Sequence, residues 1–127
     1  MPDLTPSFQE LVAHYQNTAA HNDYLHRSLT DATWSDVVLA EHRRYVETNK
    51  LGFGDACFHA LWARLLHAAA QRFGTVRALE IGVFKGQVVC LWAVIAMAQQ
   101  LDVRIHALAP LAGQPLPRFR WWVRVST

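Results

Sequence analysis

The stretch LEIGVFKGQ at residues 79–87 holds the residues best suited to chemistry, because the acid Glu80 precedes the glycines Gly82 and Gly86. Glycine adopts backbone angles that other residues resist, and its lack of a side chain lets a ligand approach the backbone. A helix that begins after such a turn offers unpaired N–H groups and a partial positive charge, which suit a carboxylate or phosphate. The stretch therefore predicts a ligand-binding turn, with Glu80 facing the crevice where open α/β sheets bind ligands.

The turn needs a strand before it and a helix after it, and the flanking residues predict both. Residues 77–82 are a short apolar run that closes on glycine, which is typical of a buried strand. Residues 86–100 have the composition of a strongly apolar helix, and residues 103–108 predict a second strand. Strand, helix and strand with short joints predict a right-handed βαβ unit and a parallel sheet.

LEIGVFKGQ resembles the first motif of class I S-adenosylmethionine-dependent methyltransferases, in which an acid is followed by glycines at alternating positions. Glu80, Gly82 and Gly86 match that motif, and Phe84 occupies the place of the middle glycine. The stretch is especially similar to a bacterial subgroup whose strand ends Glu-Ile-Gly-Val-Phe/Tyr-x-Gly. The resemblance covers roughly residues 49–111 and implies a partial Rossmann-like core. It also implies that Glu80 and the turn from Gly82 to Gly86, with Phe84 and Lys85, contact the methionine portion of S-adenosylmethionine.

The sequence departs from this family at one position and leaves other interpretations open. The family usually places an acid after the second strand, where it binds the ribose, but Ala109 stands there and no carboxylate is near. Dinucleotide binding is the closest rival, although its G-x-G-x-x-G fingerprint needs glycine where Glu80 stands. Lys85 could meet an anion, but a solvated side chain at a helix start is the simpler interpretation. The turn could also serve only to join a strand to a helix.

The residues before the turn, 1–75, predict a helical segment. A polar stretch at 17–31 interrupts the first helical pattern, and Thr33 with Asp36 matches a capping box for a second helix. Asp55 can cap a third helix, which carries a clear apolar stripe. The expected architecture is thus α/β, with N-terminal helices followed by a partial Rossmann-like βαβ unit.

Three segments with different functional expectations follow. Residues 1–75 are the helical segment, residues 76–111 are the partial methyltransferase core, and residues 112–127 are an irregular tail rich in Pro, Arg and Trp. We interpret the chain as an N-terminal methyltransferase fragment that is weak or inactive alone, with the methyl acceptor and the catalytic residues unassigned. The alternative is a non-catalytic nucleotide-binding module, a helical interaction module or a degenerate remnant.

The composition indicates which kinds of partner and which cellular location to expect. Hydrophobic residues make up 52% of the 127 residues and charged residues 17%, which predicts a packed core. A net charge of +2 is too small to predict nucleic-acid binding. The most apolar stretch, residues 88–98, is about half of the ~20 residues that a membrane span needs, and no signal peptide is visible. We therefore expect a cytoplasmic protein without membrane or nucleic-acid partners, which self-associates through the sheet surface that missing strands leave uncovered.

The metal-ligating residue types show no motif. The seven histidines contain neither an H-x-x-x-H nor an H-E-x-x-H spacing. Cys57 and Cys90 lie far apart inside apolar helical patterns, which predicts buried free thiols. The sequence thus predicts no metal site.

Overall fold

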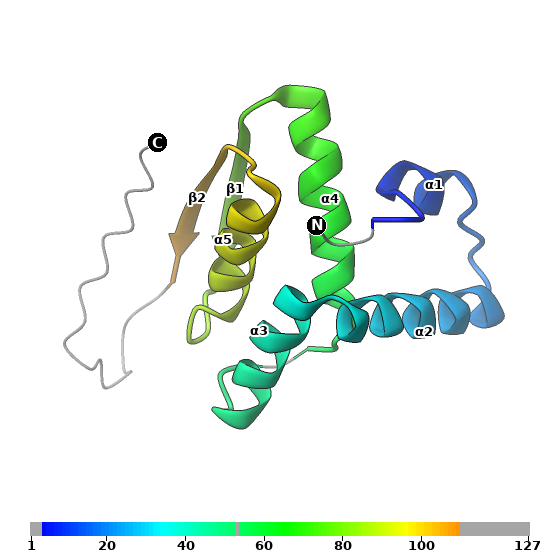
Figure 1. Cartoon of the computed structure of the whole chain (residues 1–127), viewed down its shortest axis with the longest axis horizontal. Coiled ribbons are helices and arrows are strands. Elements are labelled where there is room, and N and C mark those ends of the chain that lie inside the picture. Colours follow the sequence, from blue (N-terminus) through cyan, green and yellow to red (C-terminus); the bar gives the residue numbers. More distant parts are fainter. Residues whose placement is uncertain (1–3, 53, 110–127) are drawn as a thin grey trace.

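The structure is a computed structural model that describes residues 4–52 and 54–109 (Figure 1). Its described part contains five helices and a two-stranded sheet. In chain order the elements are α1 (Phe8–Ala13), α2 (Ala19–Ser35), α3 (Val37–Thr48), α4 (Cys57–Phe73), β1 (Val76–Ile81), α5 (Gln87–Gln99) and β2 (Val103–Leu108). The predicted α/β class, with helices first and a βαβ unit after them, is confirmed.

β1 and β2 pair in parallel, and α5 connects them (Figure 1). The register runs from Val76 opposite Val103 to Ile81 opposite Leu108. The first strand had been predicted one residue too late, because the backbone of Gly82 has already turned into the left-handed region, with φ of 86°. The helix is likewise shorter than predicted by one residue at each end, since residues 86 and 100 are its caps and both have positive φ.

Side-chain alternation gives the sheet one packed face and one open face. Ala78, Val103 and Ile105 point to the side that packs on the core of α4 and α5. The opposite face exposes Leu79 and Leu108. Alternate residues of a strand point to opposite faces, so this separation follows from the register. The open apolar face is the surface through which self-association was expected, and that expectation stays a prediction.

The core is built mainly where α4 and α5 meet. Ala60 and Ala63 of α4 are fully buried, and their small side chains allow neighbouring helices to approach closely. Trp62 and Trp92 pack edge to face with ring centroids 4.9 Å apart, which is a favoured aromatic geometry. This packing fixes α5, and with it the turn that leads into the helix.

The N-terminal helices differ from the prediction at three points, one of which is the N-cap of α4: it is Ala56 and not the expected Asp55. The polar stretch at 17–31 does not interrupt helix formation, because most of it belongs to α2, which begins after the N-cap Thr18. Thr33 does not cap a helix of its own; it lies inside α2, and Asp36 alone is the N-cap of α3. The physical reason is tertiary: α2 needs only a narrow buried stripe to pack across the start of α4 (Figure 1).

Two further expectations concern residues outside the part of the chain that the structure describes. The irregular tail predicted at 112–127 lies outside them, as does the end of the core predicted at 76–111. Within residues 4–52 and 54–109, no helix has both the length and the apolar character that crossing a bilayer would require.

Candidate functional site

The turn predicted to bind a ligand joins the carboxyl end of β1 to the start of α5. The backbone N–H of Gly82 donates to the carbonyl of Leu108 at 2.8 Å, so the turn begins where the two strand ends meet. Gly82 and Gly86 have φ of 86° and 74°, a region that side chains other than glycine rarely adopt. A Cβ added at either position would meet no atom within 4 Å, so backbone conformation and not crowding favours glycine here.

An open hollow of about 140 Å³ lies beside this turn. Ligand pockets usually measure about 300–1,000 Å³, so the hollow is large enough for one end of a cofactor and too small for a whole one. Its lining residues come from the segment before α4, the end of β1, the turn and the first residues of α5: Gly52, Glu80, Gly82, Phe84, Gln87 and Val88.

Glu80 holds the start of α5 in place. Its carboxylate accepts a hydrogen bond from the backbone N–H of Val89 in the first turn of α5, whose N-cap Gly86 offers no side chain. Burial raises the pKa of Glu80, and the hydrogen bond from Val89 offsets part of that rise. The carboxylate oxygen Oε2 is buried and has no hydrogen-bond partner among the described residues. Glu80 therefore combines a structural role with one acceptor that a ligand could use.

Gln87 and Gly52 also line the hollow, and neither was among the predicted binding residues. The side-chain oxygen of Gln87 is buried and also lacks a hydrogen-bond partner within the described part of the chain. A Cβ at Gly52 would come within 2.7 Å of Gln87 Cδ and closer still to its amide oxygen, so a side chain at position 52 would force the Gln87 amide to move. Two glycines near position 52 had been interpreted only as a helix stop, although such a pair also signals a close backbone approach.

The structure divides the five predicted binding residues into two groups. Glu80, Gly82 and Phe84 line the hollow, whereas Lys85 and Gly86 do not. The Lys85 ammonium donates to the carbonyl of Lys50 at 2.9 Å and lies 5.3 Å from the centroid of the Phe84 ring. Lys85 thus ties the turn to the segment that follows α3.

Ala109 directly follows β2, at the same edge of the sheet as the turn. Because Leu108 pairs with Ile81, the end of β2 lies beside the end of β1, as a ribose-binding position would require. No Asp or Glu occurs anywhere in residues 103–127. The edge therefore has one carboxylate, Glu80, where the resembled family usually has two.

Comparisons with protein-family models, with curated proteins and with solved structures gave no significant match to this chain. The resemblance to methyltransferases consequently rests on the motif at 79–87 and on the βαβ geometry around it.

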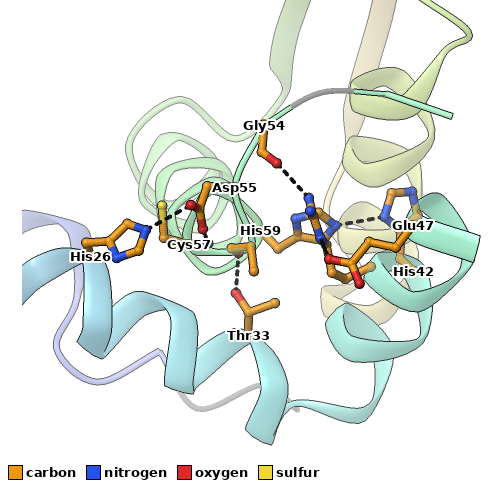
Figure 2. Close-up of polar contacts among 10 residues, drawn as sticks. His26, Thr33, His42, Glu47, Gly54, Asp55, Cys57 and His59 are labelled. Carbon is orange, nitrogen blue, oxygen red and sulfur yellow. Dashed lines mark hydrogen bonds and ion pairs between the residues drawn. The ribbon is translucent and has the colours of Figure 1, made fainter. Parts of the chain in front are cut away.

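A second polar cluster lies between α3 and α4, where two histidines are in contact. Nδ1 of His42 and Nε2 of His59 are 3.0 Å apart, and their rings appear side by side in Figure 2. His59 is only 1% exposed, and its Nδ1 is buried without a hydrogen-bond partner in the described part of the chain. We assign the shared proton to His59 Nε2, which donates to His42, because this tautomer leaves no buried N–H unpaired. Burial, with the nearby charges of His42 and Arg43, lowers the pKa of His59 to about 4.

The two cysteines have different surroundings. Cys57 is buried as predicted, and burial followed by the charge of Asp55 raises the pKa of its thiol. Cys90 is exposed, so the expectation of two buried thiols was wrong for this residue. α5 is apolar on nearly every side, and a sequence pattern of that kind does not reveal which side faces water.

Proposed function

We propose that the junction of β1 and α5 binds S-adenosylmethionine, as the cofactor-binding unit of a methyltransferase whose acceptor is unassigned. The observation that carries this proposal is the placement of Glu80. It lies at the end of a parallel strand, lines an open hollow, and stands beside a turn whose two glycines have positive φ. Ligands of open α/β sheets bind at this kind of strand end.

The chemistry of the hollow suits the amino-acid end of this cofactor. Glu80 and Gln87 each have a buried oxygen without a partner among the described residues, and both are acceptors that an ammonium group could use. The N-terminus of α5 favours a carboxylate. Bound S-adenosylmethionine would supply a methyl group activated by its sulfonium, and this chain's residues would hold and orient the cofactor.

Two alternatives remain in competition with this proposal. A dinucleotide would bring its pyrophosphate to the turn, where the Glu80 carboxylate would repel it. A junction without any ligand is favoured by the small volume of the hollow and by the hydrogen bond between Glu80 and Val89. Both alternatives predict a different outcome from the experiment below.

We expect Gly82→Val to weaken binding of S-adenosylmethionine at least about tenfold, because valine resists positive φ and its branched side chain blocks the turn. Calorimetric titration of the cofactor and its demethylated product measures this effect, with a nicotinamide dinucleotide titrated in parallel. Gly74→Val is the matched control, because Gly74 has φ of 72°, open space around its Cβ and no part in the hollow. Equal affinity in the two variants, or binding of the dinucleotide alone, would contradict the proposal.

Glu80→Gln is expected to weaken cofactor affinity by about ten- to a hundredfold, which corresponds to loss of a charge-assisted hydrogen bond worth about 1.5–3 kcal/mol. Glutamine keeps an oxygen that can accept from the Val89 N–H, and it removes the charge whose burial is unfavourable. The stability of the variant at pH 7 should therefore match or exceed that of the wild type. A variant that loses stability but binds the cofactor normally would assign Glu80 to helix capping alone.

A further inference from the structure

Three side chains of metal-ligating types meet where α2 crosses the start of α4. His26 comes from α2, Asp55 from the segment before α4, and Cys57 is the first residue of α4. Their ligand atoms all lie within 4.8 Å of one another, and His26 Nε2 is 2.9 Å from Asp55 Oδ2. Figure 2 shows the imidazole and the carboxylate facing each other, with the sulfur beside them.

The backbone near His26, Asp55 and Cys57 is held in place by hydrogen bonds from another residue, Thr33. Thr33 lies two turns after His26 on the same side of α2, and its buried hydroxyl donates to the carbonyl of Ala56 at 2.7 Å. The same hydroxyl accepts from the N–H of Ala60 at 3.1 Å. Thr33 therefore fixes α2 against the first turn of α4, and the two helices present His26 and Cys57 at a set separation.

The donor atoms are one imidazole nitrogen, one carboxylate oxygen and one sulfur, the set that zinc-like ions prefer. We propose that His26, Asp55 and Cys57 bind one divalent transition-metal ion of the zinc class, with water as the fourth ligand. A tetrahedral ion would hold such atoms about 3.3–3.8 Å apart, so closing the present spread needs roughly 1 Å of side-chain movement. His26 and Asp55 can supply it, because their side chains are about half exposed.

Charge balance favours the bound state. When the ion binds, the Cys57 S–H bond breaks, its proton leaves to water, and a metal–sulfur bond forms. The thiolate and the Asp55 carboxylate then neutralise the two charges of the ion. Burial and the charge of Asp55 raise the pKa of the Cys57 thiol, so the metal–sulfur bond must supply the free energy of its deprotonation. Arg43, a neighbouring cation, is already paired, with Glu47 at 2.6 Å and with the carbonyl of Gly54 at 3.1 Å.

The site has no sequence signature because its ligands come from two separate parts of the chain: α2 supplies His26, and the residues around the start of α4 supply Asp55 and Cys57. Asp55 and Cys57 are adjacent in space through a local turn, in which the Cys57 N–H donates to Asp55 Oδ1 at 3.3 Å. His26 precedes them by about thirty residues, and only the crossing of α2 and α4 brings it near. Metal motifs with short spacings would not detect such an arrangement.

The test is titration of the chelator-treated full chain with Co²⁺, which reports its ligands by absorption. We expect thiolate-to-cobalt charge transfer in the near ultraviolet, together with the intense visible bands of tetrahedral cobalt. Cys57→Ser should abolish the charge transfer, and His26→Gln should weaken affinity at least about tenfold. Cys90→Ser is the matched control, because Cys90 is exposed and does not belong to the cluster, and it should leave the spectrum unchanged.

A second measurement tests the proposal even if a substitution lowers the stability of the folded chain. Zn²⁺ binding to the folded chain should raise the Tm of the wild type and of Cys90→Ser. It should raise the Tm of Cys57→Ser and His26→Gln by much less than that of the wild type, whatever their starting values. The absence of a tetrahedral cobalt spectrum in the wild type would overturn the proposal. So would a charge-transfer band that persists in Cys57→Ser, or an equal Zn²⁺ response in all four proteins.

Discussion

Lowering the pH from 7 to 4 is expected to remove about 3 kcal/mol of folding stability through His59 alone. The folded chain holds the pKa of His59 at about 4, below its ordinary 6.5. The unfolded chain therefore takes up a proton below pH 6.5, while the folded chain does not until about pH 4. Stability contributed by this group is complete above pH 6.5 and falls as the pH drops toward 4, at about 1.36 kcal/mol for each pKa unit.

His42 acts in the same direction, because burial and the charge of Arg43 lower its pKa as well. While both rings are neutral, one ring hydrogen lies between the two nitrogens, which are 3.0 Å apart. Protonation of both rings would place two positive charges in contact and leave no acceptor nitrogen, so it would break the hydrogen bond that joins α3 to α4.

Urea unfolding at pH 7 and pH 4 measures this loss, and His59→Gln isolates it. Glutamine stays neutral throughout this pH range. The free energy of unfolding of His59→Gln should therefore fall between pH 7 and pH 4 by about 3 kcal/mol less than that of the wild type. His106→Gln, at an exposed position on β2, controls for the removal of a histidine and should lose as much stability as the wild type. Identical losses in His59→Gln and the wild type would show that His59 is not held neutral by burial.

Leu91→Ala is expected to destabilise the folded chain by about 2–5 kcal/mol, the cost of removing a buried leucine and leaving a cavity. Leu91 is 1% exposed and belongs to the core between α4 and α5. The same helix supplies Gln87 and Val88 to the hollow, so its packing also positions the candidate site.

Met97→Ala is the matched control for this substitution, because Met97 lies on the same helix and is 77% exposed. Its effect should stay within about 0.5 kcal/mol. Equilibrium urea unfolding at pH 7 gives both values. A smaller loss for Leu91→Ala than for Met97→Ala would mean that α5 packs through a different face.

Much of the βαβ unit was predictable because its signals are local. The apolar run before Gly82 predicted β1 to within one residue, and the glycines at 82 and 86 marked a turn that does adopt positive φ at both. The helical pattern after the turn likewise fixed α5, since an apolar segment of that length between two short strands has few alternatives. Three of the five predicted site residues line the hollow, whereas Lys85 and Gly86 of the same stretch do not.

The prediction failed where a residue's role depends on a distant partner. The polar composition of 17–31 indicated an interruption, yet α4 supplies the buried surface that α2 needs. Thr33 has the sequence context of a cap, but its hydroxyl bonds to Ala56 and Ala60 across a helix crossing. Propensity is a weak guide when such contacts between helices outweigh it.

The sequence by itself determined the α/β class, the parallel βαβ order and the acid-and-glycine turn at 80–86, because each depends on residues close together in the chain. Tertiary structure alone decided which side chains share a site. It placed Gly52 against Gln87, His42 against His59, and His26 beside Asp55 and Cys57. The spacing of residues along the chain cannot encode these contacts. The packing angles between helices determine them, and those angles depend on the whole core.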